Sequence, residues 1–167
     1  PNLVLCKGGT INYSEYNTGS SLPSVAWSWT FQGATPSSST DRNPQNITYP
    51  NAGLFKTTCI STFNNGAKDT GEIYVLIIDG AFTNIPMNDT MFCGNNINLT
   101  LDASNKQVFN RFVWSSPDVT LQAKDTFSAL NVTKTGTYKV TITNICGSTS
   151  KTVVVKQGVM PSVNLGG

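Results

Sequence analysis

Side chains that could carry out a reaction are few in this chain of 167 residues. It has no histidine, no Gly-x-Ser-x-Gly motif and no phosphate-binding loop, so the common serine, histidine–zinc and phosphate-transfer mechanisms lack their parts. Glycoside hydrolysis needs two carboxylates across one cleft, and in the first half only Asp41, Asp69 and Glu72 are dense enough to consider. Because Asp41 lies in a Pro-rich loop and Asp69 beside a predicted hairpin, we expect solvated turn residues, no catalytic residue and no enzyme.

The four cysteines form two pairs with the same spacing. Cys59 follows Cys6 by 53 positions, and Cys146 follows Cys93 by the same number. A zinc site is a poor alternative, since the chain has no Cys-x-x-Cys and no histidine. Four cysteines allow three pairings, and the repeat indicates two copies of one disulfide-stapled β-domain. A bridge that closes a loop of this length contributes about 4 kcal/mol to folding stability in the chain-entropy model. Such disulfides form in oxidising compartments, so they imply a secreted or cell-surface protein.

Composition excludes several classes of partner. The net charge is +2, and only 12% of the residues are charged. This charge is too small and too dispersed to indicate nucleic acid or an anionic membrane as a partner. No stretch approaches the roughly 20 apolar residues of a membrane span, so no membrane insertion is expected. Asn, Thr and Ser supply much of the surface, which is typical of extracellular β-proteins.

The clearest strand pattern lies between residues 25 and 31. Val25, Trp27, Trp29 and Phe31 alternate with small polar residues, as in a strand with one buried face. Trp29 and Phe31 are therefore expected in a core. Trp27 lies on the same face, and burial is the favoured interpretation for it too. The alternative is that Trp27 stacks on a sugar ring, which makes it the one possible ligand contact.

Strand and turn signals fill the rest of the chain. Strands are expected at 10–13, 46–49, 54–63 and 72–78 in the first half, and at 97–102, 112–114, 138–142 and 150–156 in the second. Residues 32–44 read as a loop, and Asn64-Asn65-Gly66 is a strong hairpin signal. Turns about every ten residues predict an all-β chain of two tandem sandwiches, covering 1–79 and 80–159 and joined near Asp79-Gly80.

Several motifs support a family resemblance. The first half, with Ala26-Trp27-Ser28-Trp29-Thr30-Phe31-Gln32-Gly33, Asn43-Pro44 and Ala52-Gly53-Leu54-Phe55, resembles PKD-type immunoglobulin-like domains of Bacteroidetes surface proteins. The second half, with Cys93-Gly94, Leu101-Asp102-Ala103 and Thr135-Gly136-Thr137-Tyr138, is similar to the immunoglobulin-like repeats before the type B sorting domain of type IX secretion substrates. The resemblance implies two immunoglobulin-like sandwiches with one disulfide each.

The resemblance extends to the second core and to the tail. By analogy with immunoglobulin domains, Trp114 is expected to pack on a Cys93–Cys146 bridge, with Tyr138 also in the core. Trp114-Ser115-Ser116-Pro117 departs from the family's Trp-Ser-Thr-Gly, which changes the turn after the strand. Residues 160–167 look like a linker or the opening of a further repeat, so a third repeat is expected to follow.

Calcium is the one cofactor worth considering. Tandem extracellular β-domains often hold Ca²⁺ at their junction with six to eight oxygen ligands. Asp79, Asn84, Asn88 and Asp89 lie at the expected junction, with Asp79 and Asp89 as the charged candidates. No acidic triplet or loop signature accompanies them, so an ordinary polar linker with no metal is the favoured interpretation.

The sequence therefore predicts a spacer segment of a long adhesin-like surface protein, with neighbouring repeats as partners. One alternative is a module that binds glycan or protein through Trp27 or through the loop at residues 32–43. Another is an accessory segment of a secreted hydrolase whose chemistry lies elsewhere. A third is a filament subunit that assembles through exposed sheet edges.

Overall fold

The computed structural model describes residues 3–15, 22–83, 85, 89–93, 96–105, 107–121 and 127–158, apart from the side chain of Cys93. These residues form thirteen β-strands and no helix, which confirms the predicted all-β class. The chain divides into two compact units, Pro1–Asp79 and Gly80–Gly167, called unit 1 and unit 2 below. Residues 160–167, the predicted linker or further repeat, lie outside the described residues.

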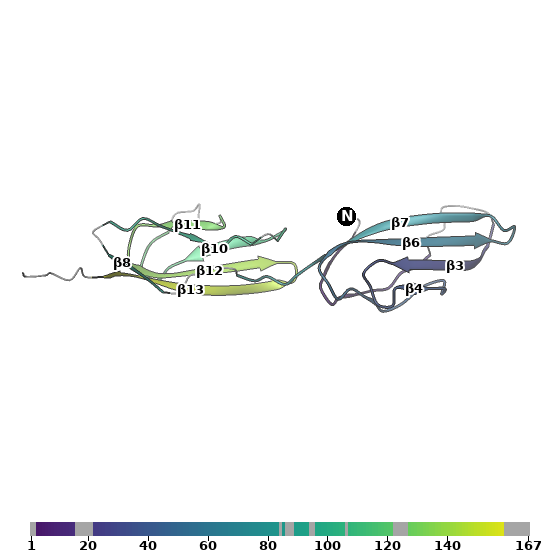
Figure 1. The fold of residues 1–167 in the computed structure, drawn as a ribbon, viewed down its shortest axis with the longest axis horizontal. Helices are drawn as coiled ribbons and strands as arrows, with labels where there is room; N and C mark the ends of the chain where they lie inside the picture. Colours follow the sequence, from purple (N-terminus) through teal and green to yellow (C-terminus); the bar gives the residue numbers. More distant parts are fainter. Residues whose placement is uncertain are drawn as a thin grey trace, which may run out of the picture. The chain divides into compact units, whose positions relative to one another are not determined.

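Unit 1 is built on a five-stranded sheet. Its strands follow the order β1-β7-β6-β3-β4, and β7, β6, β3 and β4 can be followed side by side in Figure 1. The bounds are Leu3–Cys6 for β1, Ser24–Phe31 for β3, Ser38–Ser39 for β4, Gly53–Phe63 for β6 and Lys68–Ile78 for β7. Strand β1 runs parallel to β7, whereas β3, β6 and β7 pair antiparallel.

A second, much smaller layer belongs to unit 1. Strands β2 (Thr10–Ile11) and β5 (Ile47–Thr48) pair antiparallel. A core cluster lies between this pair and the large sheet. Its fully buried members include Phe31, Tyr49 and Val75, which are 0% exposed.

Unit 2 has the same arrangement. Its larger sheet follows the order β10-β12-β13-β8, and β9 pairs with β11 opposite it. The bounds are Thr90–Cys93 for β8, Leu99–Asp102 for β9, Arg111–Ser115 for β10, Ala129–Val132 for β11, Gly136–Asn144 for β12 and Gly147–Gly158 for β13. Strand β8 runs parallel to β13, as β1 does to β7. The predicted repetition of one sandwich is thus confirmed in strand order.

The register shows which residues correspond between the units. Gly53 pairs with Ile77 and Phe55 with Val75 in unit 1; Gly136 pairs with Val155 and Tyr138 with Val153 in unit 2. Both glycines have φ of 151°, a conformation that L side chains rarely adopt. Aligning the two glycines makes Phe55 the counterpart of Tyr138.

The same register relates the aromatic residues of β3 and β10. Phe31 pairs with Thr57, two residues after Phe55, and Trp114 pairs with Val140, two residues after Tyr138. Phe31, and not a tryptophan, is therefore the counterpart of Trp114. Trp29 corresponds to Phe112, which pairs with Ile142 as Trp29 pairs with Cys59.

Four strands were not predicted: β1, β4, β8 and β11. Strand β4 lies inside the expected loop at residues 32–44. Strand β7 begins at Lys68, four residues before the predicted start. Its first residues are polar and exposed, so hydrophobic alternation does not reveal them. Within the described part of the chain, no helix has the length and apolar character needed to cross a membrane.

Candidate functional site

The predicted bridge between Cys6 and Cys59 is wrong. Cys59 is a free thiol. Cys6 pairs with Ile78 and Cys59 with Gly71, so the two cysteines lie beside β7 seven positions apart. At about 3.3 Å per residue, this separation far exceeds the reach of a disulfide. Unit 1 therefore lacks the internal staple that the sequence predicted.

The predicted bridge between Cys93 and Cys146 is wrong for a similar reason. Cys93 pairs with Gly158 at the end of β13, whereas Cys146 immediately precedes Gly147 at its start. The length of β13 separates the two backbone positions. Among the cysteines whose side chains the structure describes, Cys6 and Cys146 each take part in a disulfide, whereas Cys59 does not.

Trp114 consequently packs in a core without the expected bridge beside it. It is 5% exposed, and its indole Nε1 donates a hydrogen bond of 3.0 Å to the carbonyl of Phe127. Tyr138 is 2% exposed, and its hydroxyl donates to the carbonyl of Lys134 at 2.8 Å. A tyrosine at the start of this strand that bonds upstream backbone is a hallmark of immunoglobulin domains. Burial raises the pKa of Tyr138, and Asp118 adds to the effect.

The aromatic residues of unit 1 form one buried stack. Trp29 is 6% exposed and Phe31 is 0% exposed. The ring of Tyr13 lies 5.6 Å from that of Trp29 and 5.1 Å from that of Phe31, between centroids. The hydroxyls of Tyr13, Tyr49 and Thr57 form a triangle with edges of 2.8, 3.1 and 3.0 Å. Burial, the largest effect, raises the pKa of Tyr13 well above its usual value.

Trp27, the possible ligand contact, is half-buried and packs against the unit 1 core. The Arg42 guanidinium lies 5.6 Å from the centre of its ring, within cation–π distance. Arg42 in turn pairs with Glu15, Nε to Oε2 at 2.9 Å. A basic side chain of unit 1 thus lies over the ring of Trp27.

The loop at residues 32–43 is tied to the sandwich at several points. Thr35 and Thr48 exchange two backbone hydrogen bonds of 2.8 and 2.9 Å. The carbonyl of Asp41 accepts a 3.0 Å hydrogen bond from Trp29 Nε1. The Asp41 carboxylate accepts a hydrogen bond from Ser39 at 3.1 Å. Asp41 therefore has a structural role in holding the loop to the core.

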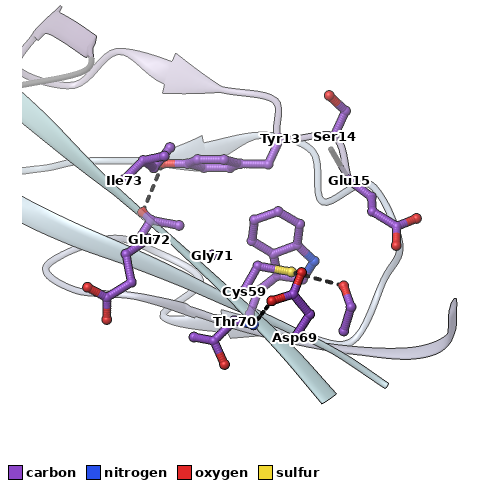
Figure 2. A pocket seen from close by; sticks show the side chains of 12 residues that line it. Tyr13, Ser14, Glu15, Cys59, Asp69, Thr70, Gly71, Glu72 and Ile73 are labelled. Atoms are coloured by element: carbon purple, nitrogen blue, oxygen red, sulfur yellow. Dashed lines mark hydrogen bonds between the residues drawn. The ribbon is translucent and has the colours of Figure 1, made fainter. Parts of the chain in front are cut away.

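The other two carboxylates considered for hydrolysis point to opposite faces of β7. Alternation places Asp69, Gly71 and Ile73 on the inner face and Glu72 on the outer one, and the Glu72 side chain projects away from Cys59 in Figure 2. Glu72 bonds Lys56 Nζ at 2.8 Å, and this partner raises the pKa of Lys56. Asp69 and Glu72 both contribute to the lining of the cavity described below, but from opposite faces of β7, so their carboxylates do not face one another across it.

A cavity of about 420 Å³ opens on the inner face of the unit 1 sheet. Residues of β6 and β7 line it, as do Tyr13 and Trp29. Figure 2 labels Tyr13, Cys59, Asp69 and Gly71 among the residues around it. Its lining consists of Tyr13, Ser14, Glu15, Trp29, Thr57, Cys59, Ser61, Asp69, Thr70, Gly71, Glu72 and Ile73. A Cβ atom built on Gly71 would meet no atom within 4 Å. The glycine therefore leaves part of this space open.

The electrostatics of the cavity are negative. Burial is the first cause that raises the pKa of the Cys59 thiol, and the charges of Glu15 and Asp69 raise it further. A hydrogen bond from Ser24, followed by smaller effects that include Arg42, lowers the pKa of Glu15. Glu15 is thus suited to remain a carboxylate, whereas a catalytic acid needs a raised pKa. The raised thiol pKa likewise disfavours a reactive thiolate.

Sequence analysis missed the cavity as a site. Of its lining, only Trp29, Cys59, Asp69 and Glu72 had been singled out, each for another reason. The sequence feature that could have revealed the cavity is the set of alternate residues Thr57, Cys59 and Ser61. These are three small or polar residues on the inner face of a long strand. A face that lacks large apolar side chains cannot fill the interior of a sandwich.

The calcium candidates are occupied in other ways where they are described. Asp79 pairs with Lys7 at 3.6 Å, and Asp89 Oδ1 accepts a hydrogen bond from the Val154 amide at 3.1 Å. Asn84 and Asn88 lie outside the described residues. Among the described residues, no group of three or more His, Cys, Asp or Glu side chains could hold a metal ion.

Known sequences and known structures give different results. No protein-family model matches the chain, and no curated protein sequence matches it. A variant of a titin fragment with three immunoglobulin domains aligns at TM-score 0.61 with 11% identity, over 95% of this chain and 63% of the fragment. An I-band fragment of titin aligns at 0.58 with 12% identity, over 93% and 62%.

A third structure leads to the same conclusion. The N-terminal four immunoglobulin domains of Dscam1 isoform 7.44 align at TM-score 0.57 with 11% identity, over 94% of this chain and 44% of that one. This chain thus spans less than two thirds of each of these structures. At such identities the likeness shows the fold alone. The chain is a tandem of two immunoglobulin-like β-sandwich units.

Proposed function

We propose that the chain is a load-bearing spacer segment of a long secreted or cell-surface adhesin-like protein, composed of PKD-like and immunoglobulin-like repeats exported by a Bacteroidetes type IX system. The observation that carries the proposal is the pairing of the first and last strands of each unit. In unit 1, Leu3 to Cys6 of β1 run parallel to Val75 to Ile78 of β7. In unit 2, Thr90 to Cys93 run parallel to Val155 to Gly158.

This pairing resists a pulling force for a geometric reason. The chain enters unit 1 through β1 and leaves it through β7, so a force on the two ends pulls these parallel strands in opposite directions along their length. The hydrogen bonds between them are then loaded together and not one after another. Such a unit holds its length under load, which is what a spacer requires. Near-independent units in series also make total length proportional to repeat number.

The test is single-molecule force spectroscopy of the chain between two handles, with reductant present so that strand contacts carry the load. The Lys7 amide donates a 2.8 Å hydrogen bond to the Ile78 carbonyl, and Gly8 follows with φ of 78°. Proline suits the position before such a glycine in a type II turn. Lys7→Pro should remove this bond and lower the unfolding force of unit 1. Lys7→Ala, which loses only the Asp79 ion pair, should change it little.

Two results would count against the spacer. Equal unfolding forces for Lys7→Pro and Lys7→Ala would show that the β1–β7 pairing does not bear the load. A separate experiment measures binding of the chain to a glycan panel and to intact cells, with Trp27→Ala beside it. Specific binding that the variant loses would replace the spacer by a binding module. Binding by neither protein is the result expected of a spacer.

A further inference from the structure

The inner face of the unit 1 sheet changes character along its length. Phe31, Thr57 and Ile73 form one cross-strand row, and Trp29, Cys59 and Gly71 form the next. In unit 2, the row corresponding to the second consists of Phe112, Ile142 and Thr149. The rows differ at all three positions: Trp29 stands for Phe112, Cys59 for Ile142 and Gly71 for Thr149. The first exchange adds side-chain volume, but the other two remove more, so a cavity is left in unit 1 beside Cys59 and Gly71.

The walls of the cavity and its charge suit two different parts of a ligand. Tyr13, Trp29 and Ile73 line it with aromatic and aliphatic surface, which favours an apolar group. Glu15 and Asp69 also line it, and their charges act on Cys59 within it. Among the residues that the structure describes in this lining, none is a lysine or arginine. An anion would be repelled there, whereas a cation would be attracted.

One of these two carboxylates is available to a ligand. Glu15 already pairs with Arg42. Asp69 accepts a 2.8 Å hydrogen bond from the Thr70 amide, and within the described part of the chain no lysine or arginine forms an ion pair with it. Asp69 lies on the inner face, opposite Ser61. It is therefore the carboxylate that a bound cation would meet.

Unit 2 shows that this kind of sandwich accommodates a cationic side chain on the same face. Lys151 is the counterpart of Ile73, since Lys151 pairs with Val140 and Ile73 pairs with Thr57. The Lys151 ammonium donates a hydrogen bond of 2.7 Å to the carbonyl of Ile85. Its aliphatic stem follows the inner face of the sheet while its charged end finds a polar partner. In unit 1 the described residues that line the cavity include no cationic side chain.

We propose that the cavity of unit 1 binds an organic cation with an apolar stem, the chemistry of a lysine or arginine side chain. The stem packs against Trp29 and Ile73, and the cationic end bonds the Asp69 carboxylate. Such a charge-assisted bond in a partly enclosed site is stronger than one between neutral groups. The cation comes from a partner polypeptide or from a free alkylamine, and these two sources are separated by the probes below.

The experiment is an NMR titration of the full chain that follows the Gly71 amide and the Trp29 indole. The probes are the blocked peptide acetyl-Gly-Arg-Gly-amide, the same peptide with citrulline in place of arginine, and agmatine. Citrulline keeps the shape of arginine but has no charge. We expect the arginine peptide to shift both signals and the citrulline peptide to bind about tenfold more weakly. Tighter binding of agmatine than of the peptide identifies a free amine as the source, and weaker binding identifies a polypeptide.

Two variants test the site itself. Gly71→Thr introduces the residue that unit 2 has at this position and fills the space, so it should abolish the shift of the Trp29 indole signal while the rest of the spectrum stays native. Asp69→Asn should weaken arginine binding about tenfold and remove the preference over citrulline. Asp41→Asn is the matched control, because Asp41 belongs to the same unit and does not line the cavity.

Any of three results would overturn the proposal. The first is that the citrulline peptide binds as tightly as the arginine peptide. The second is that the Gly71→Thr variant shows an unchanged Trp29 shift, and the third is that no probe moves the Gly71 and Trp29 signals. Because Gly71 lies in open space with an ordinary backbone conformation, loss of binding in Gly71→Thr would not reflect loss of the fold. A native spectrum of the free variant checks this directly.

Discussion

Cys6 and Cys93 hold the same place in their units: each is the last residue of the strand that runs parallel to the unit's closing strand. The second cysteines have no such correspondence. Cys59 lies in the interior of β6, whereas Cys146 follows the end of β12. Cys59 and Cys146 therefore lie at different places in their units, although each follows the preceding cysteine by the same number of residues. Equal spacing in the sequence does not imply the same disulfide pairing in both units.

The first prediction concerns the thiols. When the chain is denatured without reductant and treated with iodoacetamide, Cys59 should carry the label, and Cys6 and Cys146 should not. In the native state, Cys59 should react slowly at neutral pH and faster as pH rises, because burial raises the thiol pKa and only the thiolate is nucleophilic. Peptide mapping by mass spectrometry measures both. A reduced sample, labelled at all three, is the control, and an unlabelled Cys59 would contradict the structure.

The sandwich fold was predictable from sequence, whereas the disulfide was not. Alternation at Trp27, Trp29 and Phe31 and the Asn64-Asn65-Gly66 turn are local signals, and both appear in the structure as β3 and the β6–β7 hairpin. Whether two cysteines can form a disulfide depends on the strand in which each one lies and on its position along that strand. In unit 1, β2 contains no cysteine that could cross to Cys59 in the opposite sheet, so the inter-sheet bridge of immunoglobulin domains lacks one partner.

The second prediction concerns the hydroxyl of Tyr138. Tyr138→Phe removes its hydrogen bond to the Lys134 carbonyl, so the free energy of unfolding of unit 2 should fall by about 1 kcal/mol. Hydrogen exchange of the β12 amides measures this loss. Tyr74→Phe is the control, because Tyr74 is 43% exposed and should change little. Unchanged protection in β12 would mean that the bond to Lys134 does not stabilise the unit.

The third prediction separates backbone strain from a steric clash. Gly33 and Gly66 both have positive φ, 73° and 82°. A Cβ on Gly33 would overlap the ring of Phe55, whereas one on Gly66 would meet nothing within 4 Å. Gly66→Ala should therefore cost about 1 kcal/mol from strain alone. Gly33→Ala should lower the unfolding free energy of unit 1 by about 1–3 kcal/mol more than Gly66→Ala does, because the Phe55 ring must move.

Urea unfolding of unit 1 measures both costs. The comparison is internal, since each variant adds one methyl group at a left-handed glycine of the same unit. Equal losses for the two variants would show that the Phe55 ring moves aside without cost. A larger loss for Gly66→Ala would contradict the geometry of the Gly33 turn.

The cavity was within reach of sequence reasoning in principle. Once the Asn64-Asn65-Gly66 turn is accepted, Thr62 pairs with Lys68, and counting along both strands brings Cys59 opposite Gly71. The prediction failed because the strand was started at Glu72, one residue too late to include Gly71. The acidic character could not be predicted in this way, because Glu15 comes from the chain after β2 and reaches the cavity only through tertiary packing.

The last prediction concerns the acid stability of unit 1. A hydrogen bond from Ser24, with a smaller effect of Arg42, lowers the pKa of Glu15 in the folded state. A carboxyl with a lowered folded pKa contributes stability above its unfolded pKa and loses it as pH falls through the folded value. Glu15→Gln should therefore reduce the unfolding free energy near neutral pH, by less than about 1 kcal/mol given the exposed partner Arg42. Below both pKa values, variant and parent should be equally stable.

Urea unfolding at a series of acidic pH values measures how the stability difference between Glu15→Gln and the parent changes with pH. Ser24→Ala removes the first cause of the lowered pKa, so it should flatten the acid dependence in the same direction as Glu15→Gln. Ser28→Ala, on the outer face of the same strand, is the matched control and should leave the dependence unchanged. A stability difference between Glu15→Gln and the parent that grows as pH falls would have the wrong sign and would contradict a stabilised carboxylate at Glu15.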